Sequence, residues 1–206
     1  MEVLKRILFT TLLAGSTLYA AAQTNAVLQK AFHNSYGDEA NKNYAAAITD
    51  VFPYYTENSY EINIRLGWLY YLNRDYPSSE QYYRKAVNLR PESIEAKFGY
   101  VQPLALLQSW DKVLEQYQAI IKIAPQNTQA NYWAGVIYYN RKQYSTAINC
   151  FKIVVDLYPF DYDGNHMLGW AILMSGHKSE ARPYFETALV IKPGDDSSTD
   201  GLNHCK

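Results

Sequence analysis

The chain has 206 residues, and its 19 Lys and Arg residues against 20 Asp and Glu residues give a formal net charge of −1. No basic stripe is visible, which argues against nucleic acid and anionic lipid as partners. The chain has only two cysteines, Cys150 and Cys205, so we expect stability to come from packing rather than from a disulfide framework.

Residues 1–22 have the pattern of a secretory signal peptide. Lys5 and Arg6 form a charged start, an apolar run follows over 7–20, and three alanines supply the small residues of a cleavage site before Gln23. The run is short for a membrane span, and an uncleaved anchor is the main alternative. The segment therefore predicts export across the inner membrane to the periplasm, with no integral membrane span after cleavage.

Residues 23–59 are expected to form a degenerate N-terminal helical hairpin. The run Asn-Tyr-Ala-Ala-Ala-Ile at 43–48 is typical of the start of a helix. Pro53 then falls early, and the segment is out of phase by about two residues with the chain that follows.

A period of 34 residues organises the next part of the chain. Prolines recur at this spacing: Pro91, Pro125, Pro159 and Pro193. They divide 60–195 into four equal windows: 60–93, 94–127, 128–161 and 162–195. Each window holds a helical stretch, a polar break and a second helical stretch that the proline ends, because proline lacks an N–H and disfavours helix in the residue before it. Such a period indicates stacked copies of one supersecondary unit.

Small residues recur where the two helices of a unit are expected to cross. Gly67 and Gly135 lie on the first helix, and Ala147 and Ala181 would face such positions from the second. Aromatic residues then follow at fixed positions of the second helix, and we expect them to fill the space between neighbouring units. They are Tyr83, Phe151 and Phe185.

The window 94–127 departs from this pattern. Val101 takes the place of the glycine, Val113 takes the place of the facing alanine, and Pro103 falls inside the first helix. We expect a wider or bent hairpin there. It could reflect drift of the repeat or a kink that shapes a binding groove.

The last residues, 196–206, are expected to form a short cap or tail. Gly194 to Ser198 carry a helix N-cap signal, and about two turns of helix could span Thr199–Cys205, with Leu202 packing on the last unit. More than a full period separates Cys150 from Cys205, so no disulfide between them is predicted.

These windows resemble the tetratricopeptide repeat family, which combines Leu-Gly-x-x-Tyr in the first helix, Ala and an aromatic residue in the second, and a closing Pro. The matching residues of the first window are Leu66, Gly67, Tyr70, Tyr83, Ala86 and Pro91. The window 128–161 matches through Ala134, Gly135, Tyr138, Ala147, Phe151 and Pro159. The window 162–195 matches through Leu168, Gly169, Ala181, Phe185, Ala188 and Pro193. The resemblance implies an all-α fold, a right-handed superhelix of stacked antiparallel helix hairpins, in a secreted or periplasmic bacterial member of the family.

In that family the first helix of each hairpin lines the concave side. The corresponding face here is rich in aromatic residues, which are favoured as interface anchors. The candidate partner-binding residues are Trp68, Tyr71, Phe98, Gln102, Tyr132, Tyr139, His166 and Trp170. The alternative is that several of these rings only cover the helix of the next repeat. The basic clamp with which some members hold acidic chaperone tails is absent, because Ile64, Trp68 and Phe98 are among the residues at its places.

No catalytic, cofactor-binding or metal-binding constellation is visible, since the four histidines are scattered without ligand spacing. We therefore predict that the protein is not an enzyme but an interaction scaffold of the bacterial envelope, holding a peptide or protein segment on an aromatic concave groove. The alternative is a structural subunit that self-assembles or docks into an envelope complex through its solenoid ends, which would make it a homo-oligomer or part of a larger assembly.

Overall fold

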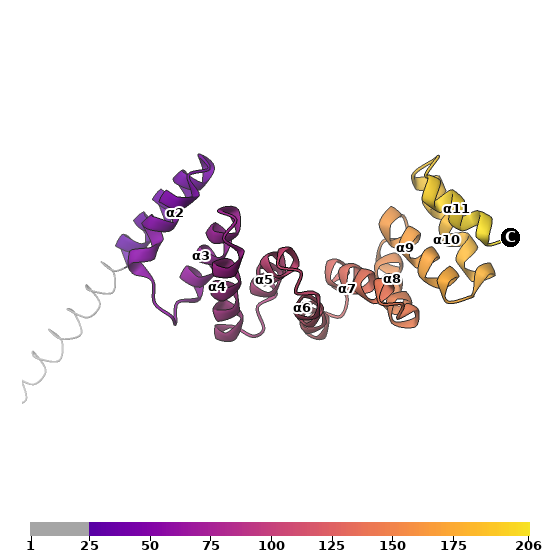
Figure 1. Cartoon of the computed structure of the whole chain (residues 1–206), viewed down its shortest axis with the longest axis horizontal. Coiled ribbons are helices and arrows are strands. Elements are labelled where there is room, and N and C mark those ends of the chain that lie inside the picture. The colour runs from indigo at the N-terminus through magenta and orange to yellow at the C-terminus, as the bar shows by residue number, and fades with distance from the viewer. Residues whose placement is uncertain (1–24) are drawn as a thin grey trace, which may run out of the picture. The chain divides into compact units, whose positions relative to one another are not determined.

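The computed structural model describes residues 25–206, which form helices joined by short turns (Figure 1). The predicted signal peptide, 1–22, lies outside the described residues. The chain divides into two compact units, of which the first ends at Pro91 and the second begins at Glu92. We call them the N-terminal unit and the C-terminal unit, and each is described by itself.

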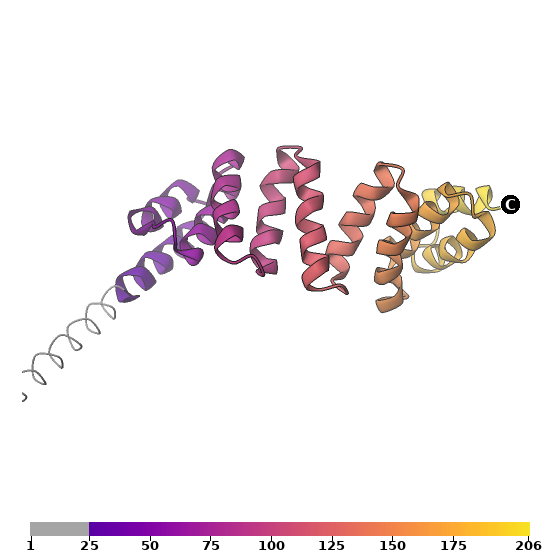
Figure 2. The same cartoon turned by 90° about the horizontal axis from the view of Figure 1, so that it is seen from below.

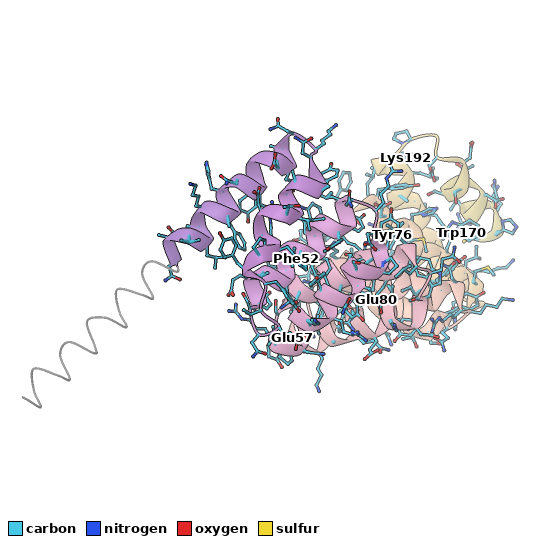
Figure 3. All side chains as sticks on the ribbon, turned by 60° about the vertical axis from the view of Figure 1, so that its left-hand side comes forward. Phe52, Glu57, Tyr76, Glu80, Trp170 and Lys192 are labelled. Carbon is cyan, nitrogen blue, oxygen red and sulfur yellow. The ribbon has the colours of Figure 1, made fainter. Side chains whose placement is uncertain are left out.

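The N-terminal unit is built from helices that pack around a small apolar core. Its elements are a helical segment over 25–40, α2 (Tyr44–Val51), the 3-10 helix η1 (Phe52–Tyr54), α3 (Tyr60–Leu72) and α4 (Tyr76–Leu89). Val51, Ile62 and Leu66 form the centre of the core, and partly buried side chains from 25–40 pack against them. Figure 3 labels Phe52 and Glu57 at η1 and in the loop that follows it.

The C-terminal unit is a series of helix hairpins followed by one more helix, and its alternating helix directions can be followed by colour in Figure 2. Its helices are α5 (Ile94–Leu106), α6 (Trp110–Ile123), α7 (Thr128–Asn140), α8 (Tyr144–Leu157), α9 (Tyr162–Met174), α10 (Lys178–Ile191) and α11 (Asp196–His204). The starts of α5, α7, α9 and α11 are each separated by 34 residues, so the helix spacing follows the proline period.

Each first helix begins at a residue whose side chain caps it. Ser93, Asn127 and Asp161 accept a hydrogen bond from the backbone N–H three residues later, and Ser59 and Asp195 do the same for α3 and α11. These side chains satisfy donors that the first turn of a helix leaves without partners. The polar residue before each first helix therefore fixes where that helix starts.

The turn inside each hairpin repeats one backbone conformation. Arg74, Gln108 and Lys142 have positive φ angles of 62°, 55° and 60°, and the equivalent residue of the last hairpin is Gly176, with φ 94°. In the turn at Lys142, the N–H of the next residue bonds the carbonyl of Tyr138 over 2.9 Å. This is the bond pattern of a Schellman motif, which satisfies carbonyls at the end of the first helix.

The glycines of the first helices lie directly against aromatic rings of the same hairpin. A Cβ atom added at Gly135 would lie 2.7 Å from the ring of Phe151, and one at Gly67 would lie 2.9 Å from the ring of Tyr83. The sequence pattern predicts that these rings fill the space between neighbouring units. They lie within the hairpin as well, and the glycine leaves the room that the ring occupies.

The hairpin α5–α6 lacks this contact because Val101 takes the place of the glycine. The two helices lie less closely against each other than those of the other hairpins do. Helix α5 nevertheless continues past the buried Pro103 and ends at Leu106. The proline therefore removes one backbone donor without ending the helix.

Helix α11 covers the last hairpin and begins three residues before the predicted start at Thr199. It begins early because the side chain of Asp195 accepts a hydrogen bond of 2.8 Å from the N–H of Ser198. A Cβ atom at Gly201 would lie 2.4 Å from the ring of Phe185, so the helix lies very close to α10. Leu202 packs against the core cluster that contains Phe185, as the sequence predicts.

Cys150 and Cys205 are both buried and free. Burial raises the pKa of the Cys150 thiol to about 11. Among residues 25–206, no helix has the length and apolar character that a membrane crossing requires.

Candidate functional site

In the N-terminal unit, the candidate residues Trp68 and Tyr71 lie on α3 and stack on each other. Their ring centroids are 5.7 Å apart and the planes differ by 22°. The indole Nε1 of Trp68 donates a hydrogen bond of 2.7 Å to Oε1 of Glu39, and Tyr71 also meets Tyr76 at 6.0 Å. The indole of Trp68 is therefore held by the helical segment 25–40.

A buried cation anchors the same contact. Arg65 is 4% exposed and forms an ion pair with Glu39. Its Nε and Nη2 atoms donate to Oγ of Ser35 over 3.1 Å and 2.9 Å, and its guanidinium lies 4.0 Å from the centre of the Tyr36 ring. No sequence motif marks this cluster, because Arg65 lies 30 residues from Ser35 and 26 from Glu39.

In the C-terminal unit, Phe98 and Gln102 lie one turn apart on α5, and both are half-buried. Phe98 meets Tyr117 of α6 edge to face, with ring centroids 6.4 Å apart. Burial raises the pKa of Tyr117 to about 12, so its phenol stays neutral at physiological pH.

Tyr132 and Tyr139 lie on α7 and are packed by rings of their own hairpin. Tyr132 lies 5.9 Å from Phe151 and 5.2 Å from Trp133, measured between ring centroids. Tyr139 meets Tyr144 edge to face at 5.6 Å. Burial raises the pKa of both Tyr132 and Tyr139.

His166 and Trp170 form a polar contact with α11. Nε1 of Trp170 lies 3.1 Å from both Nε2 of His166 and Oγ of Ser197, and the His166 and Ser197 atoms are 2.9 Å apart. The His166 ring stacks on Tyr162 at 5.4 Å. Burial lowers the pKa of His166, although Asp195 and Asp163 oppose the shift. The imidazole is therefore neutral at pH 7. Figure 3 labels Trp170 on α9.

The eight candidate residues form separate local groups. The structure brings together Trp68 with Tyr71 and His166 with Trp170, and it places the other four in pairs along α5 and α7. All eight are half-buried. Trp68 and Trp170 each bond a neighbouring helix, as the alternative interpretation of the aromatic face requires, yet each ring keeps part of its surface exposed.

An open cleft that the sequence pattern does not predict lies between α7 and the start of α9. It has a volume of about 430 Å³. Its lining comes from α7, the end of α8 and the loop into α9: Thr128, Gln129, Tyr132, Trp133, Val154, Tyr158, Asp161 and Asp163. Trp133 and Tyr158 are exposed by 45% and 60%. They lie outside the face chosen from the repeat pattern, so only their exposure, which the sequence does not show, could have found them.

Metal chemistry has no geometric support in the part of the chain that the structure describes. No group of three or more His, Cys, Asp or Glu side chains within residues 25–206 is arranged to hold a metal ion.

Comparison with known proteins places the repeat pattern in a family. Family models described as tetratricopeptide repeat match residues 60–93 and 129–161. The chain carries tetratricopeptide repeats at these two places. No curated protein matches the chain.

Solved structures share the fold over most of the chain. A crystal structure of MamA has a TM-score of 0.70 at 18% identity and covers 82% of this chain and 93% of its own. MamA from Desulfovibrio magneticus RS-1, from residue 41 to its end, has a TM-score of 0.69 at 19% identity, with coverages of 82% and 97%. YrrB, described as a TPR protein with an unusual peptide-binding site, has a TM-score of 0.73 at 14% identity, with coverages of 90% and 97%. The predicted all-α, tetratricopeptide-like solenoid class is confirmed.

Proposed function

We propose that the protein is a non-catalytic scaffold that holds a peptide or protein segment on the first helices of its hairpins. The observation that carries the proposal is the set of aromatic rings on α5, α7 and α9 of the C-terminal unit, each half-buried against neighbours and partly open to solvent. In the N-terminal unit, α3 carries its own pair of such rings. Rings of this kind are common anchors in interfaces. Tetratricopeptide repeats in the chain and the peptide-binding site named for YrrB favour the same function.

The group at α9 is the best-defined anchor of the face. Trp170 meets Phe185 edge to face at 5.3 Å and bonds Ser197 through its indole. These contacts hold the ring in one orientation before a partner arrives, which lowers the entropic cost of binding. His166 is neutral beside it and can accept or donate a hydrogen bond.

We propose that the protein acts in the bacterial envelope. The N-terminus of the mature chain tests this location. Export and cleavage after Ala22 would leave Gln23 as the first residue. N-terminal sequencing of the protein purified from cells tests this. Met1 at the start of the mature chain would overturn the cleavage and leave an anchored protein as the alternative.

Affinity purification tests the scaffold. The mature protein is used as bait in an envelope extract, beside the Trp170→Ala variant and a Trp110→Ala control. Trp110 is a 51% exposed tryptophan at the start of α6, a second helix. We expect a partner retained by the wild type and the control but lost with Trp170→Ala.

Thermal unfolding of the same variants separates binding from folding. A Trp170→Phe variant keeps an aromatic ring against Phe185 while removing the indole N–H and part of the ring area. It replaces Trp170→Ala in the binding experiment where Trp170→Ala lowers the melting temperature. Retention of the partner by both Trp170 variants would contradict the proposed face.

The second candidate, a structural subunit that associates through its C-terminal end, has less support. The exposed residues of α11 and the terminus are polar: Asp196, Ser197, Thr199, Asp200, Asn203, His204 and Lys206. A polar outer face is what a terminal cap of a repeat stack needs for solubility. Sedimentation at increasing concentration tests self-association, and a dimer lost on changing α11 would revive this role.

A further inference from the structure

The cleft between α7 and the start of α9 combines aromatic walls with negative charge. Tyr132 and Trp133 meet edge to face on one side, and the 60% exposed ring of Tyr158 lies on another. Asp161 and Asp163 complete the lining, and no basic residue takes part in it. Faces of aromatic rings and carboxylates both attract cations.

In two other hairpins the chain fills the equivalent place with a cation of its own, whereas α5–α6 has Ala124 there. In the N-terminal unit, the Arg90 guanidinium lies 4.0 Å from the centre of the Tyr60 ring and bonds Glu61 over 2.7 Å. In the C-terminal unit, Nζ of Lys192 lies 4.8 Å from the centre of the Tyr162 ring and 3.0 Å from Asp195. Figure 3 labels Lys192 in the loop after α10.

The 34-residue period shows what is different at the cleft. Tyr158 stands at the repeat position that Arg90 and Lys192 occupy, and Asp161 stands at the position of Asp195. Compared with α9–α10, the hairpin α7–α8 has kept this carboxylate but has lost the basic side chain. Thr128 stands at the position of Tyr162, so the rings of this cleft come from other positions, among them Tyr158. Within residues 25–206, neither Asp161 nor Asp163 forms a salt bridge, although Asp161 accepts a 2.6 Å hydrogen bond from the N–H of Gly164.

We propose that this cleft binds a lysine or arginine side chain of a partner polypeptide. That the partner is a polypeptide rests on the proposed scaffold function. The new element is that the partner presents a basic side chain to this cleft. The cation would lie against the faces of Trp133 and Tyr158, with Asp163 balancing its charge. The cleft is open and has about 430 Å³ of space, which leaves room for the neighbouring residues of an extended segment rather than enclosing a small free cation.

NMR spectroscopy of the ¹⁵N-labelled protein tests the site with two neutral-ended tripeptides. The probe is acetyl-Gly-Arg-Gly-amide, and the control is the same peptide with citrulline, which keeps the shape of arginine and removes its charge. The indole N–H of Trp133 is assigned with a Trp133→Phe variant. We expect the arginine peptide to shift this signal in a saturable way and the citrulline peptide to leave it nearly unchanged. The indole of Trp110, which lies outside the cleft, should not respond.

The Asp163→Asn variant removes one charge from the rim without touching a helix cap. We expect it to weaken the binding of the arginine peptide about two- to five-fold, which is the effect of losing an exposed ion pair. Tyr158→Ala should weaken it by a similar factor through loss of a cation–π contact. An unchanged amide spectrum away from the cleft shows that each variant is folded, and added salt should weaken binding to the wild type.

Three results would overturn the inference: equal shifts with arginine and citrulline, equal responses of Trp110 and Trp133, or no response of Trp133 in the folded protein. A failure here is distinct from failure of the scaffold. Trp170→Ala should leave the Trp133 titration unchanged, and loss of the arginine response would leave the Trp170-dependent capture of a partner intact.

Discussion

Two hairpins of the C-terminal unit, α5–α6 and α7–α8, have the same helix lengths but are packed by different side chains. Each pairs a helix of 13 residues with one of 14. In α7–α8, Gly135 makes room for the fully buried ring of Phe151. In α5–α6, Val101 stands at the glycine position and Tyr117 at that of the phenylalanine, and the helices lie further apart.

A second difference concerns a buried polar position on the first helix. Asn131 donates through Nδ2 to the carbonyls of Pro125 and Asn127, both over 2.9 Å. The equivalent residue of α5 is Lys97, which is 5% exposed and whose pKa is lowered by burial. Caps and turns therefore set the length of the repeat, whereas a few interior positions decide how closely the two helices of a hairpin pack.

Removing the buried ring should give the largest difference in stability between the two hairpins. Phe151→Ala is expected to lower the free energy of unfolding by about 3–5 kcal/mol, because it leaves a cavity against Gly135. Tyr117→Ala in the looser hairpin should cost less. Urea denaturation followed by circular dichroism measures both, and a larger loss for Tyr117→Ala would show that α5–α6 is the tighter hairpin.

A side chain at the glycine position should have the next largest effect on the free energy of unfolding. Gly135→Ala places a methyl group against the ring of Phe151 and should cost about 1–3 kcal/mol. In the Phe151→Ala background the same change should cost nothing, because the clash is gone. Gly37→Ala is the control: no atom lies within 4 Å of its added Cβ, and it should stabilise helix 25–40 by up to about 1 kcal/mol.

Removing the amide donor of the tighter hairpin should have a smaller effect. Asn131→Asp keeps the shape of the side chain but cannot donate to the carbonyls of Pro125 and Asn127. We expect a loss of about 1–3 kcal/mol near neutral pH, from two hydrogen bonds. The urea midpoint measures it, and an unchanged midpoint would mean that water replaces the amide without cost.

Transferring the amide to the looser hairpin should have the smallest effect and the opposite sign. Lys97→Asn removes a buried cation and supplies a donor for the carbonyl of Ser93, the equivalent of Asn127. We expect a gain of about 0.5–1.5 kcal/mol at neutral pH.

The pH dependence of that gain identifies its cause. The folded pKa of Lys97 lies below its ordinary value of 10.5, because burial outweighs the opposing influence of Glu92 and Glu115. Between the two pKa values the unfolded chain binds more protons, so wild-type stability should rise with pH there. The advantage of Lys97→Asn should therefore be full at neutral pH and shrink as the pH rises through the folded pKa. A gain that does not vary with pH would exclude the buried charge as its source.

The sequence predicted the fold class because its signals are local. Prolines, polar residues before the first helices and the Leu-Gly pairs act within one hairpin, so their spacing is enough to place them. The contact of Trp68 with Glu39, in contrast, joins segments 29 residues apart and depends on which helix lies opposite. The cleft beside Trp133 was missed for the same reason, since its walls come from three helices, α7, α8 and α9, and the loop before α9.

The turns at Arg74, Gln108 and Lys142 have a consequence for how this protein could change over time. Their left-handed backbone disfavours residues with a Cβ atom, and only the last hairpin uses glycine there. Lys42, in the turn before α2, has the same left-handed backbone with φ 61°, so the chain holds an unused reserve of stability at four sites. Glycine at any of them could offset a destabilising change elsewhere, so new binding surfaces could be explored without loss of the fold.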